Sequence, residues 1–138
     1  MTLNFDTVWK DPMMRKILHK FANSLFCGEN IEFLEQGVPA SATAAKALYE
    51  FFVANEKVNI SHAEKTELDR LAKLGKYGDM TEAFTSAMNN IKKLVRDDTL
   101  AKLSTTLDKI KIANAANLKL ARDGAKLPVI YIEPILVI

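Results

Sequence analysis

Apolar residues recur every three or four positions along most of this chain, and this spacing restricts its fold more than any other feature. The pattern is clearest between residues 80 and 95, where the apolar positions are Met80, Phe84, Ala87, Met88, Ile91, Leu94 and Val95. Because a helix completes a turn in 3.6 residues, side chains at this spacing lie on one helical face. The same spacing appears in several other segments separated by glycine or proline, so the sequence predicts an all-α fold.

Residues that favour helix starts mark the expected boundaries. Asp11 before Pro12 is typical of an N-cap followed by the first helical position, and Ser41 is a second candidate cap. Ser61 and Glu64 match a capping box, in which both side chains accept from free backbone N–H groups. The expected helices begin at Pro12, Glu29, Ser41, Ser61 and Met80, and a last one begins at Asp97–Asp98 and continues toward 121 as one helix or two.

The end of the chain has a different character. Residues 127–138 read LPVIYIEPILVI, a run rich in β-branched residues and broken by two prolines, which favours an extended segment over a helix. No second strand is evident as its partner. We therefore expect a helical domain over residues 1–124 and an extended apolar tail over 125–138. The tail packs on the helices, binds something else, or pairs with a second copy to form a homodimer.

Composition excludes several classes of protein. The 19 basic and 17 acidic residues give a net charge of +2, too small to indicate nucleic acid as the partner. One cysteine and two histidines supply neither a disulfide nor a Cys/His metal framework, and no glycine-rich phosphate loop is present. We therefore expect no metal, no cofactor and no catalytic residues of the chain's own.

Location is predicted from what the sequence lacks. The first residues, MTLNFD, show no basic region leading into an apolar run and no myristoylation motif. The most apolar stretch, residues 127–138, is too short to span a bilayer. We expect a cytoplasmic protein.

Five short segments, in order over residues 5 to about 106, resemble the RGS domain, the regulator of G-protein signalling. Residues 26–34 (FCGENIEFL) resemble the family signature of an aromatic residue, a Glu-Asn pair and an Ile-Asp/Glu-Phe run. Residues 8–12 (VWKDP) with Phe21 resemble its first core helix, and residues 47–52 (ALYEFF) resemble a later one. Residues 58–60 (VNI) resemble its Val-Asn loop, and residues 84–103 resemble its last helix pair.

The resemblance implies an RGS-like helical bundle that binds the switch regions of a G-protein α subunit (Gα) and accelerates GTP hydrolysis. The partner would be Gα in its GTP or transition-state form, and it would recruit the protein to the inner membrane face. Family positions that contact Gα correspond here to Glu29, Asn30, Asn59, Leu94 and Asp98. Lys102 stands where many members carry an arginine that braces the site.

Other interpretations remain open at this stage. The chain could be an RGS-homology interaction module that does not stimulate hydrolysis. Residues 102–126, with six basic and two acidic side chains, could instead bind acidic lipid or nucleic acid, with an affinity that falls as salt rises. Finally, Asn30, Asn59 and Asp98 each precede or begin an expected helix, so helix capping alone would explain their presence.

Overall fold

The computed structural model describes the backbone of residues 3–122 and the side chains of residues 3–115. Within these residues the protein is all-α and contains no strand. The elements are α1 (Phe5–Lys10), α2 (Pro12–Ser24), α3 (Gly28–Gln36), α4 (Ala42–Leu48), the π-helical turn η1 (Tyr49–Val53), α5 (His62–Lys73), the 3₁₀ turn η2 (Tyr77–Asp79), α6 (Thr81–Leu94), the π-helical turn η3 (Val95–Thr99) and α7 (Leu100–Arg122).

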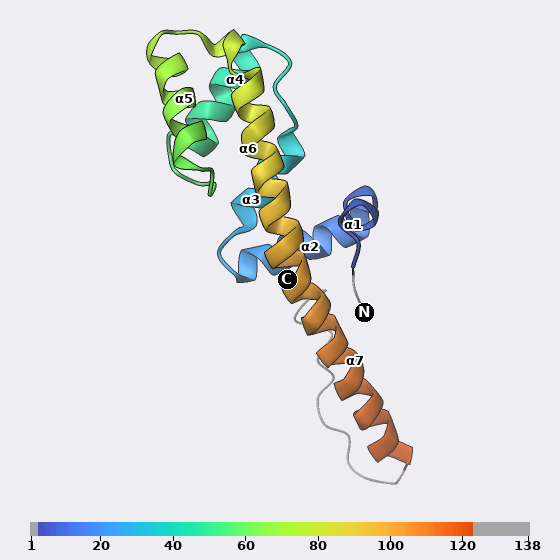
Figure 1. Cartoon of the computed structure of the whole chain (residues 1–138). Helices are drawn as coiled ribbons and strands as arrows, with labels where there is room; N and C mark the ends of the chain where they lie inside the picture. The colour runs from blue at the N-terminus through green and yellow to red at the C-terminus, as the bar shows by residue number, and fades with distance from the viewer. Residues whose placement is uncertain (1–2, 123–138) are drawn as a thin grey trace.

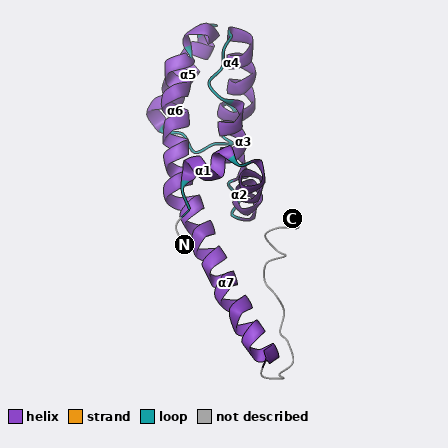
Figure 2. Ribbon diagram, turned by 90° about the vertical axis from the view of Figure 1, so that its right-hand side faces the viewer, coloured by secondary structure: helices purple, strands orange, loops and turns teal. Residues whose placement is uncertain are grey.

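The helices are organised around one long rod. Figure 1 shows α6, η3 and α7 following one another as a continuous helical column through the length of the molecule. α4 and α5 pack at the upper end of this column, whereas α2 crosses it near its middle and α1 lies to one side of it. The outer half of α7 extends beyond the other described helices, as the second view in Figure 2 also shows.

Side-chain caps place the starts of three helices where the sequence predicts them. The Asp11 carboxylate accepts from the backbone N–H of Met13 at 3.0 Å at the start of α2. The Ser41 hydroxyl accepts from the N–H of Ala44 at 3.1 Å, and the Ser61 hydroxyl starts α5 in the same way. Each of these hydrogen bonds satisfies a backbone N–H that has no partner inside its helix. The three predicted N-caps are therefore confirmed.

Three phenylalanine rings join the helices at the centre of the core. Phe33 of α3 lies with its ring centroid 5.4 Å from that of Phe52 in η1 and 6.3 Å from that of Phe84 in α6. All three side chains are buried. Tilted ring pairs at these distances contribute about 0.5–1.5 kcal/mol each beyond the area they bury, so this cluster holds α3, η1 and α6 together.

The first helix, α1, is not predicted by hydrophobic periodicity because it has only 6 residues. Asn4 caps it by accepting from the N–H of Thr7. Phe5 and Val8 enter the core, and the ring of Trp9 stacks on Phe5 with centroids 5.4 Å apart. Its stability therefore depends on tertiary packing, which a short segment of sequence does not reveal.

The prediction that Asp97 and Asp98 cap a new helix is wrong. The chain continues through η3, where the N–H of Leu100 donates to the carbonyl of Val95 five residues earlier. Both of those apolar side chains are buried, so the π-helical turn keeps the buried stripe continuous across the junction. The Asp97 carboxylate points outward and pairs with Arg96 at 2.9 Å.

Two sequence predictions extend beyond the described part of the chain. The extended tail of residues 125–138 lies outside the described residues, and so does the boundary predicted at residue 124. Among the described helices, none combines the length and apolarity needed to cross a membrane.

A hydrogen bond between a tyrosine and an aspartate links η1 to α5. The Tyr49 hydroxyl donates to the Asp69 carboxylate at 2.6 Å, and Lys65 contacts the other carboxylate oxygen at 3.0 Å. The hydrogen bond to Asp69 raises the pKa of Tyr49 to about 12. The same bond, with help from Lys65, lowers the pKa of Asp69 below its ordinary value.

This pair predicts how stability depends on alkaline pH. Replacing Tyr49 by Phe should lower the free energy of unfolding by about 1 kcal/mol at pH 7. The folded pKa lies above the ordinary value of 10.0, so the stabilisation is complete below pH 10 and is lost as the pH rises through about 12. Urea unfolding at pH 7 and near pH 11.5 measures both proteins. The difference in free energy of unfolding between the wild type and Tyr49→Phe should be smaller near pH 11.5. An equal difference at both pH values would contradict this assignment.

Candidate functional site

The first turn of α3 carries two of the predicted contact residues, Glu29 and Asn30. Cys27 occupies the N-cap position of α3 and makes no side-chain cap bond. Glu29 is half-buried, and Asn30 is only 3% exposed as the third residue of the helix. Asn30 is therefore not the cap of α3, so the capping interpretation of this residue is wrong.

Asn59 lies on the loop formed by residues 54–61. Its neighbours Val58 and Ile60 pack on the core, and this alternation leaves the Asn59 side chain exposed between them. Ser61 caps the following helix, so Asn59 is not its cap either. In Figure 1 the loop lies at the lower end of α5.

Leu94, Asp98 and Lys102 follow one another at intervals of four along the central rod. Leu94 is 38% exposed, and the Lys102 ammonium lies 3.2 Å from the Asp98 carboxylate. Asp98 lies inside η3 and does not cap a helix. Its ion pair with Lys102 is exposed, so it orients the carboxylate more than it stabilises the fold.

A surface groove of about 490 Å³ contains part of this set. It lies between the end of α2 and the start of α7 and is lined by Phe21, Leu25, Asp97, Asp98, Ala101, Lys102, Thr105, Thr106 and Lys109. The start of α3 adjoins the same region, because the Cys27 sulfur lies 3.9 Å from the Thr99 hydroxyl of η3. The fold thus brings the α2–α3 turn next to the segment that contains Asp98, while Asn59 stays on a separate loop.

One exposed aromatic residue was not among the predicted contacts. Phe26 is 95% exposed and has a φ of 60°, a left-handed conformation in which glycine is the usual residue. The N–H groups of Phe26 and Cys27 bond back to the carbonyls of Asn23 and Ala22, which is the hydrogen-bond pattern of a Schellman motif. The sequence places Phe26 in the turn signature, but nothing in it shows that the ring is left in solvent.

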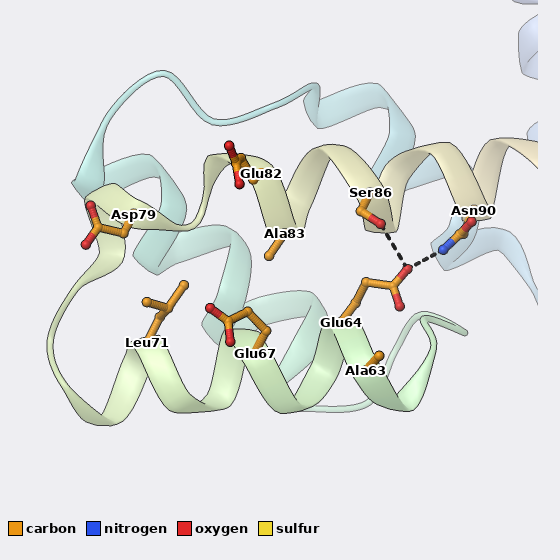
Figure 3. A pocket seen from close by; sticks show the side chains of 9 residues that line it. All are labelled: Ala63, Glu64, Glu67, Leu71, Asp79, Glu82, Ala83, Ser86 and Asn90. Atoms are coloured by element: carbon orange, nitrogen blue, oxygen red, sulfur yellow. Dashed lines mark hydrogen bonds between the residues drawn. The ribbon is translucent and has the colours of Figure 1, made fainter.

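A second hollow, of about 550 Å³, lies between α5 and α6 and is drawn in Figure 3. Glu64 enters it from α5 and is 8% exposed. Its carboxylate accepts from Asn90 and, at 3.4 Å, from the Ser86 hydroxyl, both on α6. Only the serine half of the predicted capping box is therefore confirmed; the prediction for Glu64 is wrong, because this carboxylate is used to join two helices.

The other carboxylates of this hollow lie along its rim. Figure 3 shows Glu67, Asp79 and Glu82 apart from the Glu64 hydrogen bonds. Glu67 pairs with Arg70 at 2.6 Å, and that hydrogen bond lowers the pKa of the Glu67 carboxyl. No group of three or more acidic, histidine or cysteine side chains is placed to hold a metal ion among the described residues. We interpret the hollow as a polar joint between α5 and α6.

Comparison with protein-family models, with curated protein sequences and with solved structures finds no match for this chain.

The role of Glu64 as a joint gives a stability prediction. Glu64→Ala should lower the free energy of unfolding by about 1–2 kcal/mol, because it removes a buried charged acceptor and leaves the α6 donors without it. Urea unfolding measures the change. The control is Glu67→Ala, whose exposed pair lies on α5 alone and whose loss should leave the midpoint nearly unchanged. Equal effects of the two substitutions would contradict the assignment.

Proposed function

We propose that this chain is an RGS-like helical bundle that binds the switch regions of a Gα subunit and accelerates its GTP hydrolysis. The observation that supports this proposal best is the contact between Cys27 and Thr99. It places the turn with Phe26 and Glu29 beside the segment with Asp98, as a shared contact surface requires. These residues are about 70 positions apart in the sequence, so their adjacency is a property of the fold.

The capping results add support. Asn30, Asn59 and Asp98 do not cap the helices they precede or begin. Asn59 in particular is exposed on a loop that its two neighbours anchor to the core. A polar side chain held in solvent by buried neighbours is well placed to contact a partner.

The mechanism requires little chemistry from this chain. Gα carries its catalytic arginine in cis, so an activator can work by restricting the motion of the switches. Acceleration then requires tighter binding to the transition-state arrangement of the switches than to the GTP ground state. The Asn59 carboxamide can donate and accept hydrogen bonds there without adding charge.

The remaining residues have complementary roles in this proposal. Asp98 accepts from backbone N–H groups of a switch, and Lys102 orients its carboxylate through their 3.2 Å ion pair. Phe26 and Leu25 supply apolar contact area at the α2–α3 turn. Asn30, being buried, acts through the shape of the turn and not by direct contact.

A second function is favoured by two observations. The burial of Asn30 removes one of the two predicted carboxamides from the surface. Lys102 cannot form the planar, two-pronged contact that an arginine makes. Both would suit an RGS-homology module that binds its partner without accelerating hydrolysis.

Single-turnover GTP hydrolysis by a panel of GTP-loaded Gα subunits separates these functions. We expect the wild-type chain to accelerate hydrolysis by at least one member. Asn59→Ala should reduce that acceleration by roughly tenfold, which corresponds to about 1.4 kcal/mol of transition-state binding. Asn89→Ala, an exposed asparagine on α6, is the matched control and should change nothing. Binding without acceleration across the panel would favour the second function.

Phe26 offers an independent test, because stability and binding should change in opposite directions. Phe26→Gly removes a left-handed phenylalanine and should raise the free energy of unfolding by up to about 1 kcal/mol. The same change should weaken partner binding or acceleration by roughly tenfold, since it deletes an exposed anchor. Glu56→Gly, at a second left-handed residue among those that the structure describes, with φ of 53°, controls for the stability gain. Unchanged binding by Phe26→Gly would exclude Phe26 from the surface.

A further inference from the structure

The groove between α2 and α7 has an apolar end and a basic end. Phe21 and Leu25 line it from α2, where that helix crosses the central rod, and Ala101 lines it from the first turn of α7. Lys109 lines it from the same helix, eight residues further on, which is about 12 Å along the helix axis. The two ends of the groove therefore differ in the chemistry that they offer to a ligand.

Lys109 supplies an uncompensated positive charge at the basic end. Both carboxylates that line the groove are already paired: Asp97 lies 2.9 Å from Arg96. Asp98 lies 3.2 Å from Lys102. Among the residues that the structure describes, no carboxylate lies within ion-pair distance of the Lys109 ammonium. A carboxylate from outside the chain would complement this end of the groove.

The middle of the groove presents hydrogen-bond acceptors. The Thr105 hydroxyl donates to the carbonyl of Ala101 at 3.1 Å, and the Thr106 hydroxyl donates to that of Lys102 at 2.9 Å. A hydroxyl has one proton, so both threonine oxygens are left only as acceptors. They suit the N–H groups of a peptide backbone and do not suit a phosphate group, whose oxygens are acceptors themselves.

We propose that the partner places a short peptide segment in this groove, with an apolar side chain against Phe21 and Leu25 and a carboxylate at Lys109. The distance of about 12 Å corresponds to three or four residues of extended chain. The segment therefore carries an apolar and an acidic residue three or four positions apart, in either order. This inference rests on the proposed function, because the groove shares Asp98 and Lys102 with the surface proposed for Gα.

Short peptides test the groove without Gα. The probes are Leu-Ala-Ala-Ala-Glu and Glu-Ala-Ala-Ala-Leu with blocked termini, and the matched controls carry Gln in place of Glu. Added to the isotope-labelled full-length chain, at least one Glu peptide should shift backbone amide signals of residues 101–109. It should bind at least roughly threefold more tightly than its Gln control. No shift, shifts confined to other residues, or equal affinity for both peptides would overturn the proposal.

Reversal of the charge at the basic end tests the role of Lys109. Lys109→Glu should lose the preference for the Glu peptide and instead prefer the peptide with Lys in its place. Loss of folding cannot produce such a reversal. Lys111→Glu is the control, because Lys111 is exposed on α7 but does not line the groove, and it should keep the preference of the wild type. The same change in both variants would overturn the assignment to the groove.

Binding of Gα separates this inference from the proposed function. Gα loaded with GDP and aluminium fluoride mimics the transition state. For a panel member that binds the wild type, Lys109→Glu should weaken binding by roughly tenfold at low salt and by less in 1 M NaCl. Unchanged Gα binding by Lys109→Glu would overturn the inference alone. Binding of the Glu peptide without binding of any Gα would support the groove and overturn the proposed function.

Discussion

The ring of Phe33 is the contact on which the arrangement of the helices depends. It meets Phe52 and Phe84, so the rotation of α3 about its axis is set by the core. Asn30 precedes Phe33 by three residues and therefore lies on the same face of the helix, which explains its burial. The same rotation leaves Glu29 and Glu32 at the half-exposed side. Asn30, which the family resemblance assigns to the partner surface, is therefore buried because the contacts of Phe33 with η1 and α6 fix the orientation of α3.

The sequence predicts those features of this fold that depend on neighbouring residues. Asp11, Ser41 and Ser61 cap helices because the bonds they make span two or three positions, and the stripe from Met80 to Val95 is visible in any helical projection. Three other features could not be predicted in this way. They are the hydrogen-bond partners of Glu64, the continuous helix through Asp98 and the exposure of Phe26. Each depends on a surface supplied by a distant part of the chain, and local spacing carries no information about it.

The π-helical turn η3 keeps apolar side chains in the core at a point where the local sequence favours a helix break. In η3, Val95 and Leu100 are both buried, and one widened turn keeps them on the core side while the acidic residues between them face solvent. An ordinary capped break at Asp97 would have ended the rod. The widened turn instead keeps α6 and α7 continuous and carries the Asp98–Lys102 pair to the groove beside α2. Such turns are often found at functional sites.

Backbone strain and solvent exposure coincide at Phe26, in the turn between α2 and α3. Phe26 combines a left-handed backbone with a solvated ring, and neither feature stabilises the turn that contains it. A Schellman turn tolerates this residue because its backbone hydrogen bonds remain intact. Glycine would serve the fold better at this position, and the proposed partner contact would account for the phenylalanine ring. The adjacency of Cys27 and Thr99 then ties that contact to the central rod, so displacement of the α2–α3 turn by a partner would be felt directly at η3 and Asp98.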